Sequence, residues 1–420
     1  MLRAVKIRLY PTVYQATQIN MLLGSCRVVY NQALARKINQ YKEHNITENR
    51  NTISYWFHHK LLNNPDFAYL KEHNTKVLKQ SINDMLIAYK NFFTLHRGYP
   101  KFKSKHNNKQ SCRFIRDTIS KRNDYTSYKL SLANIKNIKF RCSKKYAYFL
   151  QKNKANIRQA TLTKLPCGEF YLSILVDGDL THKGVQDTNN CIGIDLGVKD
   201  FVITSEGEVF NNLHFKKNET NKLKRLQRQL SRKQKGSNNR KKARIKLAKV
   251  YKKINDKQQY YLHQVSNSLI NENQVICMED LNVKGMLKNH NLAESISEMN
   301  FGEFKRMLEY KARWYNRKLV YVDRFYPSSK TCSYCGHVYK GLSLNEREWI
   351  CSLCGTKHDR DVNAAVNILH EGMRLVGSST TEFKLVDYPT MDDHSEMSLK
   401  SSDRVKQEVN KEQSSNLFKF

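Results

Sequence analysis

Cys332-Ser-Tyr-Cys335 and Cys351-Ser-Leu-Cys354 form two CxxC pairs that are fifteen residues apart, and Asp359-Arg-Asp361-Val-Asn-Ala-Ala follows closely. Two such pairs at this spacing are typical of a zinc ribbon, in which four thiolates enclose one zinc ion. Because cysteine fills all four positions, the zinc sphere is closed and structural, with no place for a reactive water. We expect these four cysteines to bind one Zn²⁺, and we interpret His358 as an ordinary polar residue at the ribbon exit.

Acidic residues stand on three separate predicted elements of the C-terminal half. Asp195 ends the apolar run Cys191-Ile-Gly-Ile, Glu279 ends the apolar strand that begins at Gln274, and Asp361 begins the last helix. An unpaired buried carboxylate is costly, and clustered carboxylates repel one another unless a divalent cation holds them together. Three carboxylates brought to one edge of a sheet would hold a pair of Mg²⁺ ions that activates water for phosphodiester hydrolysis.

Two of these assignments stay open on the residues alone. Glu279 and Asp280 point to opposite faces of their strand, and apolar residues occupy both faces, so the alternation does not choose between them. Asp359 and Asp361 compete in the same way, since either could cap the helix without a catalytic role. Asp361 lies nearer the apolar face of the predicted helix.

The charge of the chain points to a polyanion as its partner. The 420 residues carry a formal net charge of +35, and such an excess repels itself unless nucleic acid neutralises it. Residues 216–253 hold 17 Lys and Arg against one acid, Glu219, around an apolar seam that Gly236 interrupts. This pattern predicts a basic helical hairpin rather than an ordinary solvated helix face.

We also expect a nucleic-acid contact in the basic aromatic loop that runs from Gly98 to Lys105. The predicted contacts from both regions are Lys222, Lys224, Arg225, Arg228, Arg232, Lys233, Arg240, Lys241, Lys242, Arg244, Tyr99, Lys101 and Lys103. The longest apolar runs are strand-length, and the first residues are too polar for a secretory signal. The expected location is therefore the cytoplasm, with no membrane partner.

The pattern of the chain predicts an α/β protein of several domains. Residues 1–178 alternate like short strands and hold a helical insertion over about 12–105, and a polar linker spans 179–190. Residues 191–325 and 356–375 form a domain of strands and helices that is interrupted by the zinc ribbon at 326–355. The serine-rich segment 376–420 changes in composition, and we expect it to be disordered.

These motifs resemble those of TnpB, the OrfB-type protein of bacterial insertion sequences and a relative of type V CRISPR effectors. The resemblance covers about residues 1–372. It includes Lys6-Ile-Arg-Leu-Tyr-Pro-Thr12 at the start, and Gly193-Ile-Asp195-Leu-Gly-Val-Lys and Glu279-Asp-Leu as the first two RuvC motifs. It continues through Tyr326-Pro-Ser-Ser-Lys-Thr-Cys332 and the ribbon to the third RuvC motif, which begins at Asp359.

The resemblance implies an RNase H-like RuvC nuclease domain with catalytic residues Asp195, Glu279 and Asp361, and so selects Glu279 over Asp280. It implies a wedge β-barrel with a helical recognition lobe for residues 1–178. It also implies a guide RNA from the element's own end, a double-stranded DNA target beside a short flanking motif, and a bacterial cytoplasmic protein. The leading hypothesis is thus an RNA-guided DNA endonuclease that uses Mg²⁺.

Two other hypotheses compete with this one. The first is a nucleic-acid-binding regulator of transposition with a vestigial nuclease site, against which the three intact acids argue. The second is a structure-selective nuclease that needs no guide. Dependence on Mg²⁺ separates the first from an active enzyme, and dependence on RNA separates the second from a guided one.

Overall fold

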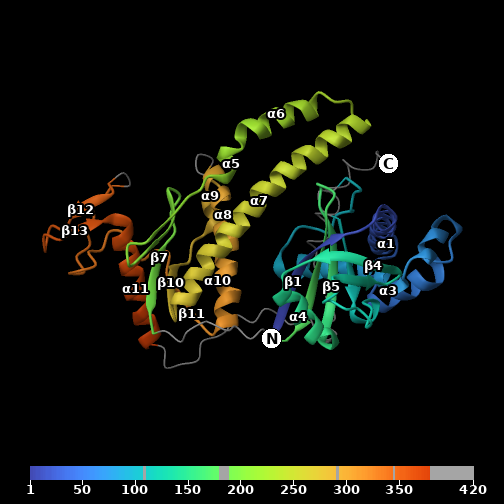
Figure 1. Ribbon diagram of the computed structural model, residues 1–420, viewed down its shortest axis with the longest axis horizontal. Helices are drawn as coiled ribbons and strands as arrows, with labels where there is room; N and C mark the ends of the chain where they lie inside the picture. The colour runs from blue at the N-terminus through green and yellow to red at the C-terminus, as the bar shows by residue number, and fades with distance from the viewer. Residues whose placement is uncertain (107–109, 179–188, 290–292, 344–345, 379–420) are drawn as a thin grey trace.

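The computed structural model describes residues 1–420 except 107–109, 179–188, 290–292, 344–345 and 379–420 (Figure 1). Most of the expected linker and nearly all of the expected tail therefore lie outside the described residues. Residues 376–378 of that tail belong to the last helix. Among the described residues, no helix has the length and apolar character needed to cross a membrane.

A six-stranded antiparallel sheet organises the N-terminal half, with strand order β2-β5-β6-β1-β4-β3. Its strands are β1 (Leu2–Tyr10), β2 (Gln110–Ile115), β3 (Lys129–Leu132), β4 (Ile135–Arg141), β5 (Ile157–Lys164) and β6 (Phe170–Asp177). Alternation explains β1, since Val5, Ile7 and Leu9 are buried while the residues between them face outward. In this order β2 and β3 are the end strands of the described sheet, and the wedge β-barrel that the resemblance implies stays a prediction.

Helices fill the chain between β1 and β2. They are α1 (Val13–His44), α2 (Arg50–Trp56), the π-helical η1 (Phe57–Leu61), the 3-10 helix η2 (Pro65–Glu72) and α3 (Thr75–Leu95). Thr12 starts α1 with a capping box, in which its hydroxyl accepts from the Gln15 N–H and its own N–H donates to the Gln15 side chain. Shorter helices follow later in this half: η3 (Arg116–Thr118), α4 (Lys144–Lys152) and η4 (Lys154–Asn156).

A five-stranded mixed sheet organises the C-terminal half, with strand order β11-β10-β7-β8-β9. Its strands are β7 (Cys191–Asp195), β8 (Asp200–Thr204), β9 (Val209–Asn211), β10 (Val275–Glu279) and β11 (Lys318–Val322). Strand β10 is central and pairs in parallel with β7 and β11, whereas β8 and β9 are antiparallel additions. Parallel strands are buried on both faces, which explains why β7 and β10 are apolar at almost every position.

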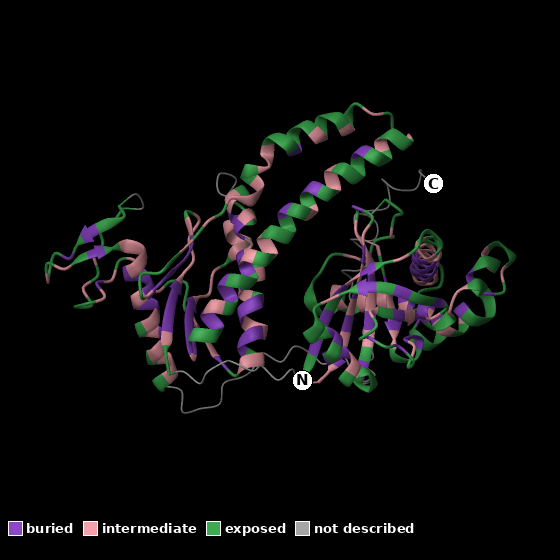
Figure 2. Ribbon diagram, viewed as in Figure 1, coloured by how far each residue is buried: buried purple, intermediate pink, exposed green. Residues whose placement is uncertain are grey.

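Helices cover both faces of this sheet (Figures 1 and 2). The helices of this half are α5 (Phe215–Asn218), α6 (Thr220–Ser231), α7 (Asn238–Glu272), α8 (Val283–Met286), α9 (Ala293–Met299), α10 (Phe301–Tyr315) and α11 (Arg360–Ser378), of which α6 extends away from the sheet (Figure 1). Helices α7 and α10 pack on the face that carries Ile276 and Met278. Helix α11 packs on the other face, against Val275 and Cys277.

The basic segment is a helical hairpin, as predicted. Helices α6 and α7 pack against each other through an apolar seam that includes Leu223, Val250 and Ile254. Beyond the seam the hairpin is mostly exposed (Figure 2). Lys252 on α7 reaches the N-terminal sheet, where it pairs with Glu169 at 3.4 Å. The hairpin thus connects the two halves of the protein.

A small two-stranded module lies between β11 and α11. Strands β12 (Glu348–Ile350) and β13 (Lys357–Asp359) pair as an antiparallel hairpin that brackets the second CxxC pair. Its hairpin runs to Asp359, four residues beyond the expected ribbon boundary at 355. The ribbon therefore leads directly into α11, with no intervening loop.

We expect the close contact between α11 and β7 to make Gly193 essential for stability. A Cβ atom at Gly193 would lie 2.1 Å from the Ala365 carbonyl oxygen, a backbone atom that cannot move without shifting the helix. Gly193→Ala should lower the free energy of unfolding by about 1–3 kcal/mol or more, measured by thermal or urea denaturation. Gly302→Ala is the matched control, since nothing lies within 4 Å of its Cβ position on α10. Equal stability of the two variants would contradict this account.

Candidate functional site

The four ribbon cysteines converge on one point. Their sulfur atoms all lie within 4.8 Å of one another, and the Cys332–Cys354 and Cys335–Cys351 sulfur pairs are each 3.6 Å apart. A tetrahedral ion with bonds of about 2.3 Å needs sulfur separations of about 3.8 Å, so this arrangement fits zinc. Hydrogen bonds from Thr356 lower the pKa of Cys354 to about 6, which favours the thiolate that binds metal.

His358 is more closely tied to this cluster than the sequence interpretation allowed. It lies on β13 opposite Trp349, is 7% exposed, and its Nε2 atom is 3.0 Å from the sulfur of Cys332. Its ring packs on Trp349 at 4.8 Å between centroids. His358 is therefore a buried partner of a metal-binding sulfur and not an ordinary polar residue. The position of His358 in the sequence did not predict this contact, because only the β12–β13 hairpin brings His358 close to the first cysteine pair.

The predicted catalytic carboxylates share one face of the C-terminal sheet. Glu279 lies on the same face of β10 as Val275 and Cys277, which pack against α11. Asp195 lies on the same face of β7 as Gly193, whose missing side chain admits α11. Asp361 stands in the first turn of α11 itself. The sheet and the helix thus bring three acids from distant parts of the sequence to one site.

The neighbouring acids Asp280 and Asp359, which competed with Glu279 and Asp361 on the residues alone, contact other groups. Asp280 lies on the opposite face from Glu279 and pairs with Lys305 at 2.7 Å and with Arg324 at 3.0 Å. Asp359 caps α11, where its Oδ1 atom accepts from the N–H groups of Asp361 and Val362. Asp280 and Asp359 therefore have structural partners, which favours Glu279 and Asp361 as the candidate site residues.

The pKa of Asp195 is raised by its burial and by the nearby acids. Burial, together with the charges of Glu279 and Asp361, raises the pKa of Asp195 to about 7. Burial also raises the pKa of Glu279, although the Ser328 hydroxyl, which donates to its Oε1 atom at 2.7 Å, acts in the opposite direction. A buried carboxylate whose pKa is raised further by neighbouring carboxylates is a candidate for a functional site.

Arg347 is a member of this site that the sequence analysis missed. It precedes β12, its guanidinium pairs with the Asp361 carboxylate, and its carbonyl accepts from the Arg360 N–H at 2.7 Å. Among the described residues, the four cysteines form a group of converging metal-ligand atoms, and the three carboxylates do not form such a group. The sequence spacing between Arg347 and Asp361 does not predict this ion pair, because the two residues become neighbours only when the ribbon hairpin forms.

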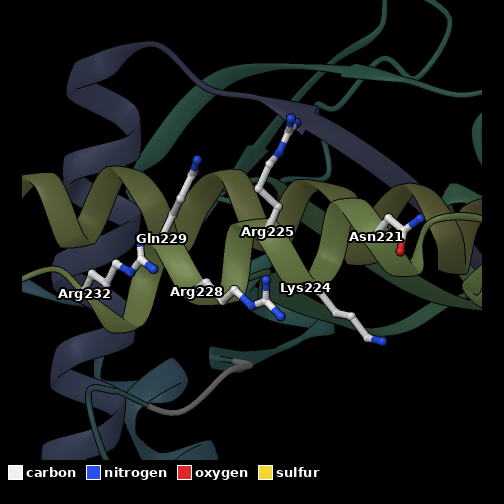
Figure 3. A pocket seen from close by; sticks show the side chains of 6 residues that line it. All are labelled: Asn221, Lys224, Arg225, Arg228, Gln229 and Arg232. Atoms are coloured by element: carbon white, nitrogen blue, oxygen red, sulfur yellow. The ribbon is translucent and has the colours of Figure 1, made fainter.

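Helix α6 presents a strongly basic surface. Asn221, Lys224, Arg225, Arg228, Gln229 and Arg232 line an open hollow of about 610 Å³ (Figure 3). Four of these six side chains are predicted nucleic-acid contacts, and all four are exposed. On α7, Lys241, Lys242 and Arg244 are also exposed. Among the remaining hairpin contacts, Lys222 is exposed and 3.5 Å from Glu219, and Lys233 is half-buried.

Three of the predicted contacts have structural partners instead. Arg240 donates from Nη1 to the carbonyls of Leu230 and Lys233, both at 2.8 Å, and so closes the C-terminal end of α6. Tyr99 shares a hydroxyl hydrogen bond of 2.8 Å with Tyr89. These partners correct our assignment of Arg240 and Tyr99.

Lys103 is the third correction. Its ammonium group lies 4.0 Å from the centre of the Tyr30 ring, and its backbone exchanges two hydrogen bonds with the Asn31 side chain. Burial lowers the pKa of Lys103. The loop is therefore attached to α1 through Lys103, a residue that the composition of the loop had predicted to contact nucleic acid. Lys101 is exposed and stays a predicted contact.

Comparisons with known proteins identify the group to which this chain belongs. Three family models match it: "Helix-turn-helix domain" (OrfB_IS605 type) at residues 1–45, "Probable transposase" (OrfB_IS605) at 173–290 and "Cas12f1-like, TNB domain" at 301–368. Residues 1–45 fold here as strand β1 and the single helix α1.

Two relatives match over most of their length. A "Putative RNA-guided DNA endonuclease" of Streptomyces pristinaespiralis is 36% identical over 88% of this chain and 89% of its own. "Putative RNA-guided DNA endonuclease InsQ" of Escherichia coli K12 is 30% identical over 88% of this chain and 92% of its own. A solved Cas12f1–sgRNA–target DNA complex aligns with a TM-score of 0.53 and 14% identity, over 88% of this chain and 98% of the other.

The fold and the site thus define a multidomain α/β protein of Cas12f1-like architecture with a four-cysteine ribbon. The chain belongs to the OrfB/TnpB family of insertion-sequence proteins. The family resemblance expected from the motifs is confirmed.

We expect Asp195 to make the stability of the metal-free protein depend on pH. Because its pKa is raised to about 7, the stability contributed by the protonated form is fully present below about pH 4 and is lost as the pH rises through 7. The loss amounts to at most about 4 kcal/mol. Asp195→Asn should remove this loss, so that its Tm in EDTA exceeds that of the parent at pH 8 and the difference shrinks at pH 5.

Asp280→Asn is the matched control for this experiment. Lys305 and Arg324 lower the pKa of Asp280, so removing its charge should lower the Tm at pH 8. A Tm difference between the parent and Asp195→Asn that does not change with pH would contradict the electrostatic account of the site.

Proposed function

We propose that this chain is an RNA-guided DNA endonuclease of an insertion sequence, and that it cuts target DNA through Asp195, Glu279 and Asp361. The observation that carries the proposal is the convergence of these three acids on the α11 face of the sheet, with the pKa of Asp195 raised by the other two. The relatives named as RNA-guided DNA endonucleases, which match this chain almost end to end, support the activity.

The donor set suits a divalent metal. Oxygen atoms of carboxylates are the ligands that Mg²⁺ prefers, and a cation between the acids would remove the repulsion that now keeps Asp195 partly protonated near neutral pH. Bound Mg²⁺, as one or two ions, would activate a water molecule and stabilise the leaving oxygen of the phosphodiester. The protein's part is to hold Glu279 through Ser328 and to hold Asp361 on the capped first turn of α11.

The basic hairpin supplies the electrostatic part of nucleic-acid binding. The exposed Lys and Arg on α6 face a hollow, and their charges neutralise phosphates without reading bases. In an RNA-guided enzyme this suffices, since base pairing between guide and target reads the sequence and the protein holds the duplex by its backbone. A guide RNA from the element's own end and a short flanking DNA motif complete the proposal, in keeping with the family resemblance of the motifs.

The deciding experiment is cleavage of a plasmid in Mg²⁺. The protein is co-expressed with the RNA from its element's end, reprogrammed to a target beside a randomised flank. We expect cutting that requires the matched guide and a particular flank, and that falls by a factor of at least about 10³ in Asp195→Ala, because the remaining acids cannot hold the metal in place.

The outcomes separate the hypotheses. Asp280→Asn, on the opposite face, should keep cutting within a few-fold of the parent. Cutting that survives in Asp195→Ala would show the catalytic assignment to be wrong. RNA binding without cutting favours the regulator of transposition, and cutting that survives ribonuclease treatment favours the guide-free nuclease.

We expect charge removal on α6 to weaken binding without changing its sequence preference. Arg225→Gln/Arg228→Gln should lower the affinity for guide RNA several-fold at physiological salt and reduce the slope of log K against log salt by up to about 2. Arg374→Gln is the control, because Arg374 is an exposed arginine that pairs with Glu371 near the far end of α11. A salt slope that is unchanged in the double variant would exclude α6 from the interface.

A further inference from the structure

Two buried asparagines on α11 bind the backbone of a segment outside their own helix. Asn363 and Asn367 are one turn apart, and each is 3% exposed. The Asn367 amide donates to the carbonyls of Ser328 at 2.8 Å and of Thr331 at 2.6 Å. The Asn363 amide donates to the Thr331 carbonyl at 2.7 Å, and its Oδ1 atom accepts from the Ser333 N–H at 3.0 Å. The segment 328–333 is therefore held to α11 at both of its ends.

This short segment touches both candidate metal sites. Its first residue, Ser328, donates from its hydroxyl to Glu279 at 2.7 Å. Its fifth residue, Cys332, is the first sulfur of the ribbon cluster. The helix that holds the segment also carries Asp361, two residues before Asn363. One set of hydrogen bonds thus connects the sulfur cluster, Glu279 and the helix of Asp361.

Hydrogen bonding alone would explain buried asparagines, since any buried amide needs partners. What distinguishes this pair is where its bonds go. A helical asparagine can satisfy its amide on its own helix, as Asn273 does at the end of α7, where it donates to the Leu269 carbonyl. Asn363 and Asn367 instead use their amides on the one segment that joins a zinc ligand to a carboxylate partner.

We propose that Asn363, Asn367 and Ser328 are positioning residues that couple zinc binding in the ribbon to divalent-metal binding at the carboxylates. The inference rests on the proposed function, since it concerns the same carboxylate site. With zinc bound, Cys332 fixes the segment, and Ser328 holds Glu279 in the orientation that the metal requires. Loss of zinc frees the segment, and Glu279 loses its oriented donor.

Coupling of this kind is reciprocal. If zinc strengthens the binding of Mg²⁺, then Mg²⁺ must strengthen the binding of zinc by the same factor. Partners of metal ligands typically change metal affinity by about 10- to 100-fold. The coupling therefore has a readout that does not involve DNA cleavage, namely the release of zinc from the full-length protein.

The experiment measures the rate at which a chromogenic chelator removes zinc from the zinc-loaded full chain, with and without millimolar Mg²⁺. In the parent we expect Mg²⁺ to slow the release by about tenfold. In Asn367→Ala and in Ser328→Ala this effect of Mg²⁺ should fall to less than about twofold, and Ser328→Thr, which keeps the hydroxyl donor, should restore it. The double variant should resemble either single variant, because both changes break one connection.

Two controls make the result decisive. Asn273→Ala removes an equally buried amide at the opposite end of the sheet from the acids and should leave the parent's Mg²⁺ effect intact. Asp195→Asn should abolish that effect, which shows that Mg²⁺ acts through the carboxylates. If Asn367→Ala misfolds, Ser328→Ala tests the proposal by itself, because it leaves both asparagine amides and their backbone acceptors in place.

The failure of this inference is distinct from the failure of the proposed function. If the parent cleaves DNA through Asp195 but its zinc release ignores Mg²⁺, or if both variants keep the parent's Mg²⁺ effect, the coupling is wrong and the nuclease assignment stands. If the parent shows neither guided cleavage nor an effect of Mg²⁺ on zinc release, the proposed function is wrong and the coupling falls with it.

Discussion

The approach of α11 to the strands β7 and β10 is the constraint on which the rest of the C-terminal half depends. Two glycines permit it from opposite sides: Gly193 on β7 leaves room for the backbone of α11, and Gly372 on α11 leaves room for the Cys277 side chain. A Cβ atom at either position would lie closer than 2.5 Å to the partner. The helix therefore sits deep on the sheet, and its first turn is brought near the ends of β7 and β10. The separation of the three acids is set by this packing and not by the acids, which repel one another.

The stability of such a site must come from elsewhere in the fold. Burying Asp195 among like charges opposes folding near neutral pH, whereas the neighbouring acid Asp280 is stabilised by Lys305 and Arg324. Adjacent positions of β10 thus differ in their partners: Asp280 pairs with two cations, whereas Glu279 accepts a hydrogen bond from Ser328. The same division holds on the hairpin, where Arg240 closes α6 with its guanidinium while Arg225 and Arg228 are exposed beside the hollow. In both places, charged residues of the same segment differ in whether a neighbouring group of the protein already binds them.

The sequence predicted what depends on spacing and periodicity. The four cysteines, the basic hairpin with its apolar seam and the strands carrying Asp195 and Glu279 follow from patterns that are local to each segment. Alternation could not choose between Glu279 and Asp280, because both faces of an interior parallel strand are apolar, and only the family resemblance selected Glu279. The sequence assigned Tyr99, Lys103 and Arg240 to nucleic acid from composition, which does not reveal that their side chains contact Tyr89, the Tyr30 ring and the end of α6. It missed Arg347 and His358 because their partners, Asp361 and Cys332, become neighbours only when the ribbon hairpin forms.

The position of the ribbon in the chain explains why Arg347 and His358 contact residues that are distant in the sequence. A structural zinc module could be inserted in any surface loop, but here it joins β11, which lies beside Glu279, to α11, which carries Asp361. Among the described residues, three side chains connect the ribbon segment to the carboxylates: Ser328 at its entry, Arg347 just before β12 and Asp359 at its exit. Because Arg347 supplies a positive charge to the same carboxylate that a metal ion would bind, cation binding at Asp361 must compete with a contact from the ribbon. The insertion point, rather than the zinc ion alone, makes the ribbon part of the carboxylate site.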